Sequence, residues 1–180
     1  MDAPTLLIRP ADEADLPAIT AIYGHAVLHG ASSYETVPPD AAEIGRRVAE
    51  VRGRGLPWLV AADEDGTVLG YAYASPFRTR PAYGWTVEDS VYVADGAQGR
   101  GVGRLLLDAL IRRCTELGYR QMVAVIGDAA NAGSVGLHAR AGFTEVGRMS
   151  GMGFKHGRWL EWLMMRRPLG EGEETSPQER

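Results

Sequence analysis

A six-residue stretch, Gln98-Gly99-Arg100-Gly101-Val102-Gly103, constrains the fold more than any other part of this 180-residue chain. It follows an apolar run, Ser90-Val91-Tyr92-Val93, and precedes a long amphipathic stretch from Leu105 to Leu117. The order strand, glycine turn, helix aims unpaired backbone N–H groups and the positive end of a helix dipole at one point. Glycines leave that point open, because they carry no side chain that would block an anion. The sequence therefore predicts a phosphate-binding turn.

Two nucleotide-binding motifs are excluded at this turn. A P-loop ends in Gly-Lys followed by Ser or Thr, whereas Gly103 is followed by Arg104. A dinucleotide motif that starts at Gly99 needs a glycine at position 104, which the arginine also occupies. The remaining pattern is Gln-x-x-Gly-x-Gly, formed by Gln98, Gly101 and Gly103. The alternative to a ligand site is a structural glycine-rich turn.

The composition is that of a single globular domain, with 45% hydrophobic and 23% charged residues. A net charge of −4 argues against nucleic-acid binding, because no basic stripe offsets it. Cys114 is the only cysteine, so no internal disulfide can form, and the histidines lack metal-ligand spacing. We expect no metal site. No apolar run is long enough to span a membrane and no signal peptide is visible, so a cytoplasmic location is expected.

The hydrophobic periodicity predicts alternating strands and helices in the second half of the chain. Strands are expected at 6–8, 58–62, 68–74, 85–93, 121–126, 143–149 and 159–165, and helices after Asp12 or Asp15, from Asp40, over 102–117 and over 131–140. This order predicts one α/β domain with a mixed sheet over residues 1–167. The polar, acidic tail at 168–180 is expected to be disordered.

Four separated blocks together resemble the GNAT N-acetyltransferase superfamily and, within it, the group of phosphinothricin and methionine sulfoximine N-acetyltransferases. The blocks are 86–93, 98–103, Asn131 with 134–138 and 141–143, and 153–159. The resemblance spans Leu6 to about Arg167. It implies the GNAT fold, in which helices flank a central, mixed, mostly antiparallel twisted sheet.

The same resemblance implies a reaction. Acetyl would be transferred directly from acetyl-CoA, without a metal, to the α-amine of a small amino acid or analogue such as phosphinothricin, methionine sulfoximine or methionine sulfone. Acetylation removes a positive charge and would detoxify such an inhibitor, which implies a role in antibiotic or herbicide resistance. The resemblance also implies a homodimer. Open alternatives are other acceptors (a polyamine, an aminoglycoside or a protein N-terminus) and a non-catalytic acyl-CoA-binding module.

Glu88 is the candidate general base. An α-amine is mostly protonated at neutral pH, so a positioned base is needed before it can attack. Strand alternation places Glu88, Ser90 and Tyr92 on one face, and Asp89 with the valines on the other. A carboxylate inside a mostly apolar strand is unusual, and it would act directly or through water. The alternatives are that Glu88 only binds the substrate ammonium, or that the neighbouring Asp89 is the base.

The resemblance also assigns residues to the cofactor. A main-chain N–H at Val93 or an adjacent residue would polarise the thioester oxygen. Asn131 and Ser134 would contact the pantetheine arm, although either could simply cap a helix. His138 would protonate the CoA thiolate or relay a proton, with a packed structural histidine as the alternative. The expected cofactor-binding residues are Val91, Tyr92, Val93, Gln98, Gly99, Arg100, Gly101, Val102, Gly103, Arg104, Asn131 and Ser134.

The acceptor side is predicted mainly from loop residues. Arg78 and Arg80 would clamp a carboxylate or phosphinate in bidentate fashion, or are surface charges. Lys155 is a further cation at a position that the group matches. Because these groups are cationic, we expect an anionic group on the substrate. The expected substrate-binding residues are Tyr34, Glu35, Phe77, Arg78, Arg80, Thr86, Val87 and Lys155.

Overall fold

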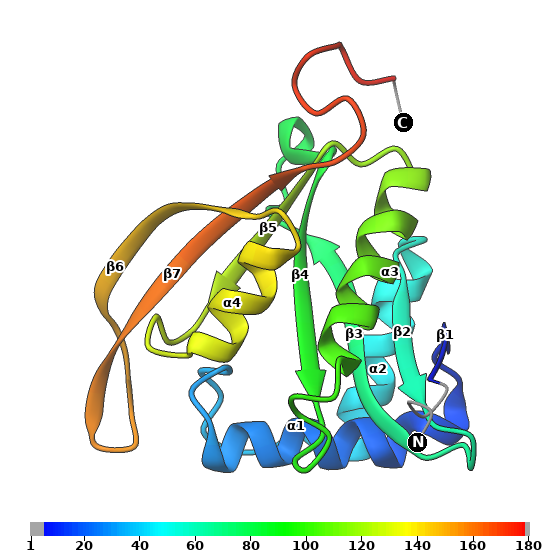
Figure 1. Cartoon of the computed structure of the whole chain (residues 1–180), viewed down its shortest axis with the longest axis vertical. Helices are drawn as coiled ribbons and strands as arrows, with labels where there is room; N and C mark the ends of the chain where they lie inside the picture. The colour runs from blue at the N-terminus through cyan, green and yellow to red at the C-terminus, as the bar shows by residue number, and fades with distance from the viewer. Residues whose placement is uncertain (1–5, 179–180) are drawn as a thin grey trace.

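The computed structural model describes residues 6–178 and is built around a seven-stranded sheet (Figure 1). Along the sheet the order is β1-β2-β3-β4-β5-β7-β6, and only β4 and β5 are parallel neighbours. The prediction of an α/β fold with a mixed, mostly antiparallel sheet is confirmed. The strands are β1 (Leu7–Pro10), β2 (Trp58–Ala62), β3 (Val68–Pro76), β4 (Thr86–Val93), β5 (Gln121–Ile126), β6 (Thr144–Lys155) and β7 (Arg158–Pro168).

Helices cover both faces of the sheet (Figure 1). They are α1 (Leu16–His29), α2 (Ala41–Gly53), α3 (Val102–Glu116) and α4 (Ala132–Arg140). Consecutive residues of β3 show that α1 and α3 lie on opposite faces, because neighbouring strand residues point to opposite sides. Tyr71 stacks on Tyr92, and the centroid of the Tyr92 ring lies 5.1 Å from that of Tyr23 of α1. A Cβ on Gly70 would instead lie 3.2 Å from Leu106 of α3.

The helix starts follow the predicted caps. The Asp40 carboxylate accepts a hydrogen bond from the Glu43 amide at the start of α2. The Asn131 side chain accepts from the Ser134 amide at the start of α4. Asp12 caps a short 3₁₀ turn, Glu13–Asp15, that leads into α1. A side-chain acceptor at each of these positions satisfies amides that the first helical turn leaves unpaired.

The sheet splits between its two parallel strands. The pairing of β4 with β5 begins at Thr86 and Gln121 and ends at Asp89 and Ala124. Beyond this point β4 continues to Val93, paired only with β3, and the two strands diverge (Figure 1). The two strands therefore bound a wedge-shaped opening in the sheet.

The hydrogen-bond phase of β4 tells which main-chain groups face this wedge. The β3–β4 ladder is framed by two bonds, from the Phe77 amide to the Thr86 carbonyl and from the Ala94 amide to the Leu69 carbonyl. In an antiparallel pair such bonds recur at every second residue. The even-numbered residues of β4 therefore bond to β3. The main-chain groups of Val91 and Val93 point the other way, into the wedge.

The β6–β7 hairpin projects away from the body of the molecule (Figure 1). Both strands are longer than the predicted 143–149 and 159–165, because pairing continues from Gly153 opposite Leu160 to Lys155 opposite Arg158. Several apolar side chains on it are exposed, namely Val146, Met149, Met152, Phe154 and Trp159.

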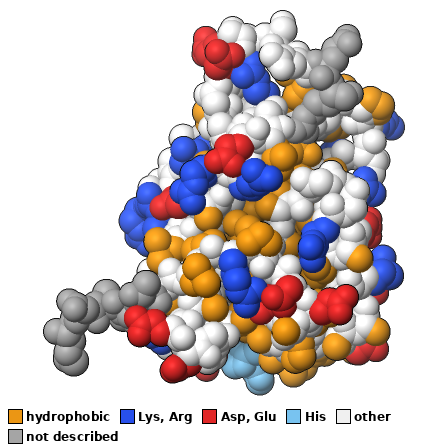
Figure 2. All heavy atoms as spheres, turned by 90° about the vertical axis from the view of Figure 1, so that its right-hand side faces the viewer, with side chains coloured by type: hydrophobic (Ala, Val, Ile, Leu, Met, Phe, Trp, Pro, Cys, Tyr) orange, Lys and Arg blue, Asp and Glu red, His pale blue; other side chains and the backbone are white. Residues whose placement is uncertain are grey.

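Beyond the predicted domain end at residue 167, Leu169 is buried and Arg120 contacts Glu171. Disorder of residues 168–180 stays a prediction, and residues 179–180 lie outside the described part of the chain. Figure 2 shows Lys and Arg interspersed with Asp and Glu on the face it presents, not gathered into one basic patch. Among residues 6–178, no helix combines the length and apolar character needed to cross a membrane.

Candidate active site

A cavity of about 230 Å³ occupies the wedge between β4 and β5. It brings together seven of the residues expected at the site: Glu88, Val91, Tyr92, Asn131, Ser134 and His138, with Asp89 as the alternative base. Sequence reasoning missed the other lining residues, which are Ser32, Tyr73, Ser90, Ala124, Val125, Ile126 and Gly127. The face alternation of β4 already placed Ser90 beside Glu88, but nothing local indicated that the loop after α1 and the end of β5 meet there.

Glu88 lies half-buried at this cavity, and within residues 6–178 its carboxylate makes no hydrogen bond or ion pair. Burial raises the pKa of Glu88, and the charge of Asp89 raises it further. Arg78 offsets part of the rise, but the net shift of the Glu88 pKa is upward. A carboxylate whose pKa moves toward neutrality and whose oxygens are unpaired is suited to accept a proton.

Asp89 points to the other face of β4 and meets His138 of α4. The His138 Nε2 atom lies 2.9 Å from Asp89 Oδ2, and Nδ1 lies 2.8 Å from the Ser134 carbonyl oxygen. Burial lowers the pKa of His138, but the hydrogen bond and charge of Asp89 and the Ser134 carbonyl outweigh this effect, so the pKa is raised. Both ring nitrogens are engaged. Protonation of a thiolate by His138 would first require one of these contacts to break.

The glycine turn has the geometry of an open anion site. Gly99 and Gly101 have φ values of 74° and 84°, in the left-handed region that favours glycine. A Cβ at either position would meet no atom within 4 Å, so the backbone is accessible from outside. Gly101 is also the N-cap of α3 and has no side chain to cap it. The first amides of α3 therefore remain available to a ligand such as a pyrophosphate.

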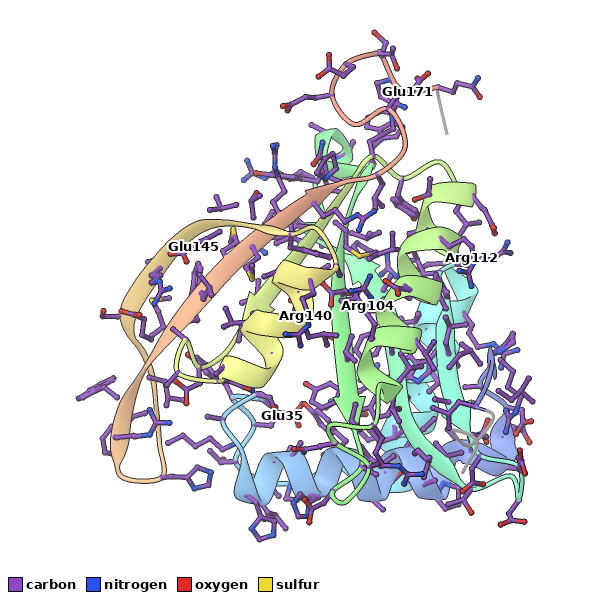
Figure 3. The ribbon with its side chains drawn as sticks, viewed as in Figure 1. Glu35, Arg104, Arg112, Arg140, Glu145 and Glu171 are labelled. Carbon is purple, nitrogen blue, oxygen red and sulfur yellow. The ribbon has the colours of Figure 1, made fainter. Side chains whose placement is uncertain are left out.

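The remaining residues of the glycine turn differ in exposure and in the contacts that they make. Gln98 and Arg100 are exposed, whereas the Val102 side chain is buried, so only its main chain is available to a ligand. Arg104 pairs with Asp108 and also donates to the Arg140 carbonyl oxygen, which ties α3 to the end of α4 (Figure 3). Gly103 lies on the inner side of α3, where an added Cβ would be 3.4 Å from Leu137.

Three of the residues predicted to bind the acceptor substrate belong instead to a network that holds the loop after α1. Tyr34 donates to the Gly127 carbonyl oxygen. Glu35 forms an ion pair with Arg47, whose hydrogen bond lowers the Glu35 pKa. Lys155 is 7% exposed and donates to the Ser33 carbonyl oxygen, and burial lowers its pKa. None of Tyr34, Glu35 and Lys155 lines the cavity. They shape the wall next to Ser32, which does.

The other residues predicted to bind the acceptor substrate lie at the start of β4 or before it. Arg78 is exposed, 4.2 Å from the centroid of the Phe77 ring, and its charge acts on Glu88. Arg80 is exposed and precedes a short 3₁₀ turn, Pro81–Tyr83. Thr86 is partly buried. Val87 is fully buried in the core, so its side chain is not available to a substrate.

The family of the chain follows from comparison with known proteins. Residues 25–143 match the acetyltransferase (GNAT) family. The chain belongs to this family. Its glycine turn, the split between β4 and β5 and helix α3 all lie within the matched segment.

Named relatives of this GNAT protein, and a solved structure, match it over nearly its whole length. The phosphinothricin N-acetyltransferase of Alcaligenes faecalis is 51% identical over 171 residues, covering 95% of this chain and 86% of the relative. The L-methionine sulfoximine/L-methionine sulfone acetyltransferase of Pseudomonas paraeruginosa is 44% identical, covering 88% and 91%. A crystal structure of a GNAT superfamily phosphinothricin acetyltransferase from Sinorhizobium meliloti, in complex with AcCoA, superposes with a TM-score of 0.94 at 51% identity, covering 97% of this chain and 94% of that one.

Proposed function

We propose that this GNAT protein transfers the acetyl group of acetyl-CoA to the α-amine of a small amino acid or analogue. Phosphinothricin, methionine sulfoximine and methionine sulfone are the acceptors that its relatives' names favour. The observation that carries the proposal is the unpaired Glu88 carboxylate, with its raised pKa, beside a cavity in the wedge of the sheet. The glycine turn follows the end of β4 and would supply the amides of an anion site next to that wedge.

The residues of the chain divide the work between binding and proton transfer. The exposed main chain at Gly99 and Gly101 and the N-terminus of α3 would hold the pyrophosphate of the cofactor. When bound, acetyl-CoA supplies an acetyl group activated as a thioester. The amide of Val93 or Val91 would donate a hydrogen bond to the carbonyl oxygen as it gains charge, an interaction that is typically worth about 3 kcal/mol. Glu88 would accept the ammonium proton, directly or through water, so that the neutral amine can attack. As the new C–N bond forms, the C–S bond of the thioester would break, and the departing CoA thiolate would take up the second proton that the nitrogen loses.

Arg78 favours an acceptor that carries an anion as well as an amine. Arg78 acts electrostatically on Glu88 from the exposed loop before β4. An arginine there would attract a carboxylate or phosphinate, a group that a polyamine lacks. Acetylation of such an inhibitor would give the protein a role in resistance.

An acceptor screen tests the proposal. Purified protein and acetyl-CoA should release free thiol with phosphinothricin, methionine sulfoximine or methionine sulfone. Spermidine, an aminoglycoside and a peptide with a free N-terminus form the matched set of alternative acceptors. Release of free thiol with only one of these alternatives would show that the protein acetylates another class of acceptor. Tight CoA binding without release for any acceptor would favour the non-catalytic module.

We also propose that the protein is a homodimer that uses the β6–β7 hairpin. Support comes from the exposed apolar residues of the hairpin, among them Phe154 and Trp159, whose rings contact each other 5.3 Å apart. Exposed apolar side chains that gather on one element are typical of interfaces. Analytical ultracentrifugation should find a dimer that Trp159→Glu dissociates. A monomeric wild-type protein at micromolar concentration would refute this part of the proposal.

A further inference from the structure

Helix α4 has an unusual attachment to the rest of the molecule. Of its nine residues, only His138 is buried, while Val135 and Leu137 are partly buried against the core. A helix that packs on a sheet ordinarily buries a stripe of apolar residues. The attachment of α4 therefore depends strongly on what the His138 ring binds.

The ring is fixed from three sides. Its Nε2 contacts Asp89 of β4, its Nδ1 contacts the carbonyl of Ser134 one turn earlier, and the Phe143 ring packs against it edge-on, with the two centroids 5.1 Å apart. The side chains of His138 and Asp89 are 5% and 1% exposed. Removing one partner of such a pair leaves the other buried and unpaired, which is strongly destabilising.

Proton bookkeeping shows how many hydrogens the pair holds. A carbonyl oxygen can only accept, so the contact with Ser134 requires a hydrogen on Nδ1. The contact between Nε2 and Asp89 Oδ2 holds a second hydrogen, on the imidazole or on the carboxyl group. Asp89 Oδ1 is buried and has no hydrogen-bond partner among the described residues. No ring nitrogen is left to serve a ligand.

The location of the pair gives it a role in shaping the site. Asp89 is the last residue of β4 that pairs with β5, so it stands where the wedge begins. The pair joins this point to α4, and the N-terminal end of α4 brings its N-cap Asn131 and, in its first turn, Ser134 to the cavity. A shift of α4 would move both residues relative to the amides of Val91 and Val93.

We propose that Asp89 and His138 are positioning residues: they clamp α4 to β4, hold Asn131 and Ser134 on the cofactor side of the cavity, and move no proton in the reaction. The inference rests on the proposed cofactor site. It makes Asp89 a residue of the GNAT site with a role distinct from that of its neighbour Glu88.

Asp89→Asn separates a clamp from a proton carrier. The side-chain amide that this substitution introduces can donate to Nε2 of a neutral imidazole, so the link survives without its charge. His138→Ala breaks the link. The double variant Asp89→Ala/His138→Ala breaks it without leaving a buried carboxylate and serves if the single variant does not fold. Arg140→Gln, an exposed change on the same helix, is the matched control.

Three measurements on these variants test the clamp. Hydrogen exchange of the α4 amides, followed by mass spectrometry without cofactor, should speed up at least about 10-fold in the broken variants, since local opening becomes easier. It should stay within about 3-fold of wild type in Asp89→Asn and Arg140→Gln. CoA titration by calorimetry should give a Kd raised about 10-fold or more in the broken variants. Their kcat at saturating acetyl-CoA should change much less.

Opposite results would overturn the clamp. Unchanged α4 exchange in both broken variants would show that the pair does not hold the helix. A loss of kcat of about 10²-fold or more in Asp89→Asn, with CoA affinity unchanged, would show that the pair moves a proton. The exchange experiment needs no cofactor. It therefore tests the clamp even if the wild-type protein failed to bind CoA, a result that would refute the proposed function instead.

Discussion

The two faces of β4 carry adjacent carboxylates in opposite circumstances. Glu88 faces the α1 side, has no side-chain hydrogen bond within residues 6–178, and has a raised pKa. Asp89 faces the α4 side and is tied to His138 at 2.9 Å. The comparison teaches that burial alone does not make a carboxylate reactive. An unpaired group can gain and lose a proton at small cost, whereas a paired group exchanges it only by disrupting its partner.

The largest effect should come from the unpaired carboxylate. Glu88→Gln keeps the shape of the side chain but removes the base, so kcat should fall about 10²- to 10⁴-fold. CoA affinity by calorimetry should stay near wild type, because Glu88 does not belong to the glycine turn. Glu145→Gln, which changes an exposed glutamate on β6, is the control and should leave kcat unchanged. Equal turnover in the two variants would remove Glu88 as the base.

The next effect tests whether the cofactor lies on the glycine-turn side of β4. Gly101→Val places a β-branched side chain at a φ of 84° and covers the backbone, so CoA should bind at least about 10-fold more weakly. The strain should also lower the free energy of unfolding by about 1–2 kcal/mol. Gly53→Ala, in α2 where an added Cβ meets nothing within 4 Å, is the matched control. Wild-type CoA affinity in Gly101→Val would contradict the assignment of the turn.

A smaller effect should appear in the pH dependence of stability. Because the pKa of His138 is raised on folding, the folded state binds its proton more tightly than the unfolded state. The resulting stabilisation is complete below the unfolded value of about 6.5 and is lost as pH rises through the folded value. Urea unfolding from pH 6 upward should show this decline, and Asp89→Asn should flatten it. A wild-type stability that rises over the same range would mean that the pair is not held as described.

The smallest effect sharpens the environment of Glu88. Arg78→Gln removes a cation that lowers the Glu88 pKa, so the acid limb of the kcat/KM profile should move to higher pH. Because Arg78 is exposed, solvent screens its attraction for the anionic group of the acceptor, so the loss in kcat/KM at the optimum should not exceed about 5-fold. Arg112→Gln, which changes another exposed arginine, on α3, is the control and should leave the acid limb in place. An acid limb that does not move would show that Arg78 exerts no effect on the base.

The sequence predicted what depends on local pattern. Periodicity located the strands at 58–62 and 121–126 with the bounds that the structure has. Alternation separated Glu88 from Asp89, and the glycines marked the turn at the start of α3. These features depend on residues a few positions apart, where backbone geometry decides the outcome.

Contacts between distant segments could not be predicted in this way. His138 and Asp89 are 49 residues apart, and Lys155 reaches Ser33 over 122 residues. Nothing in the neighbourhood of Lys155 shows that its ammonium will be buried by a loop after α1. The sequence therefore predicted that Lys155 contacts the substrate, whereas in the structure Lys155 binds the loop that forms the cavity wall.

The split between β4 and β5 has a consequence for thermal stability. Four residue pairs join the two halves of the sheet, from Thr86 and Gln121 to Asp89 and Ala124. Residues of both strands line the cavity, among them Ser90 of β4 and Val125 of β5, so a molecule lodged in the wedge would touch both halves of the sheet. Because such a ligand would bind the folded state and not the unfolded chain, the melting temperature should rise with its concentration.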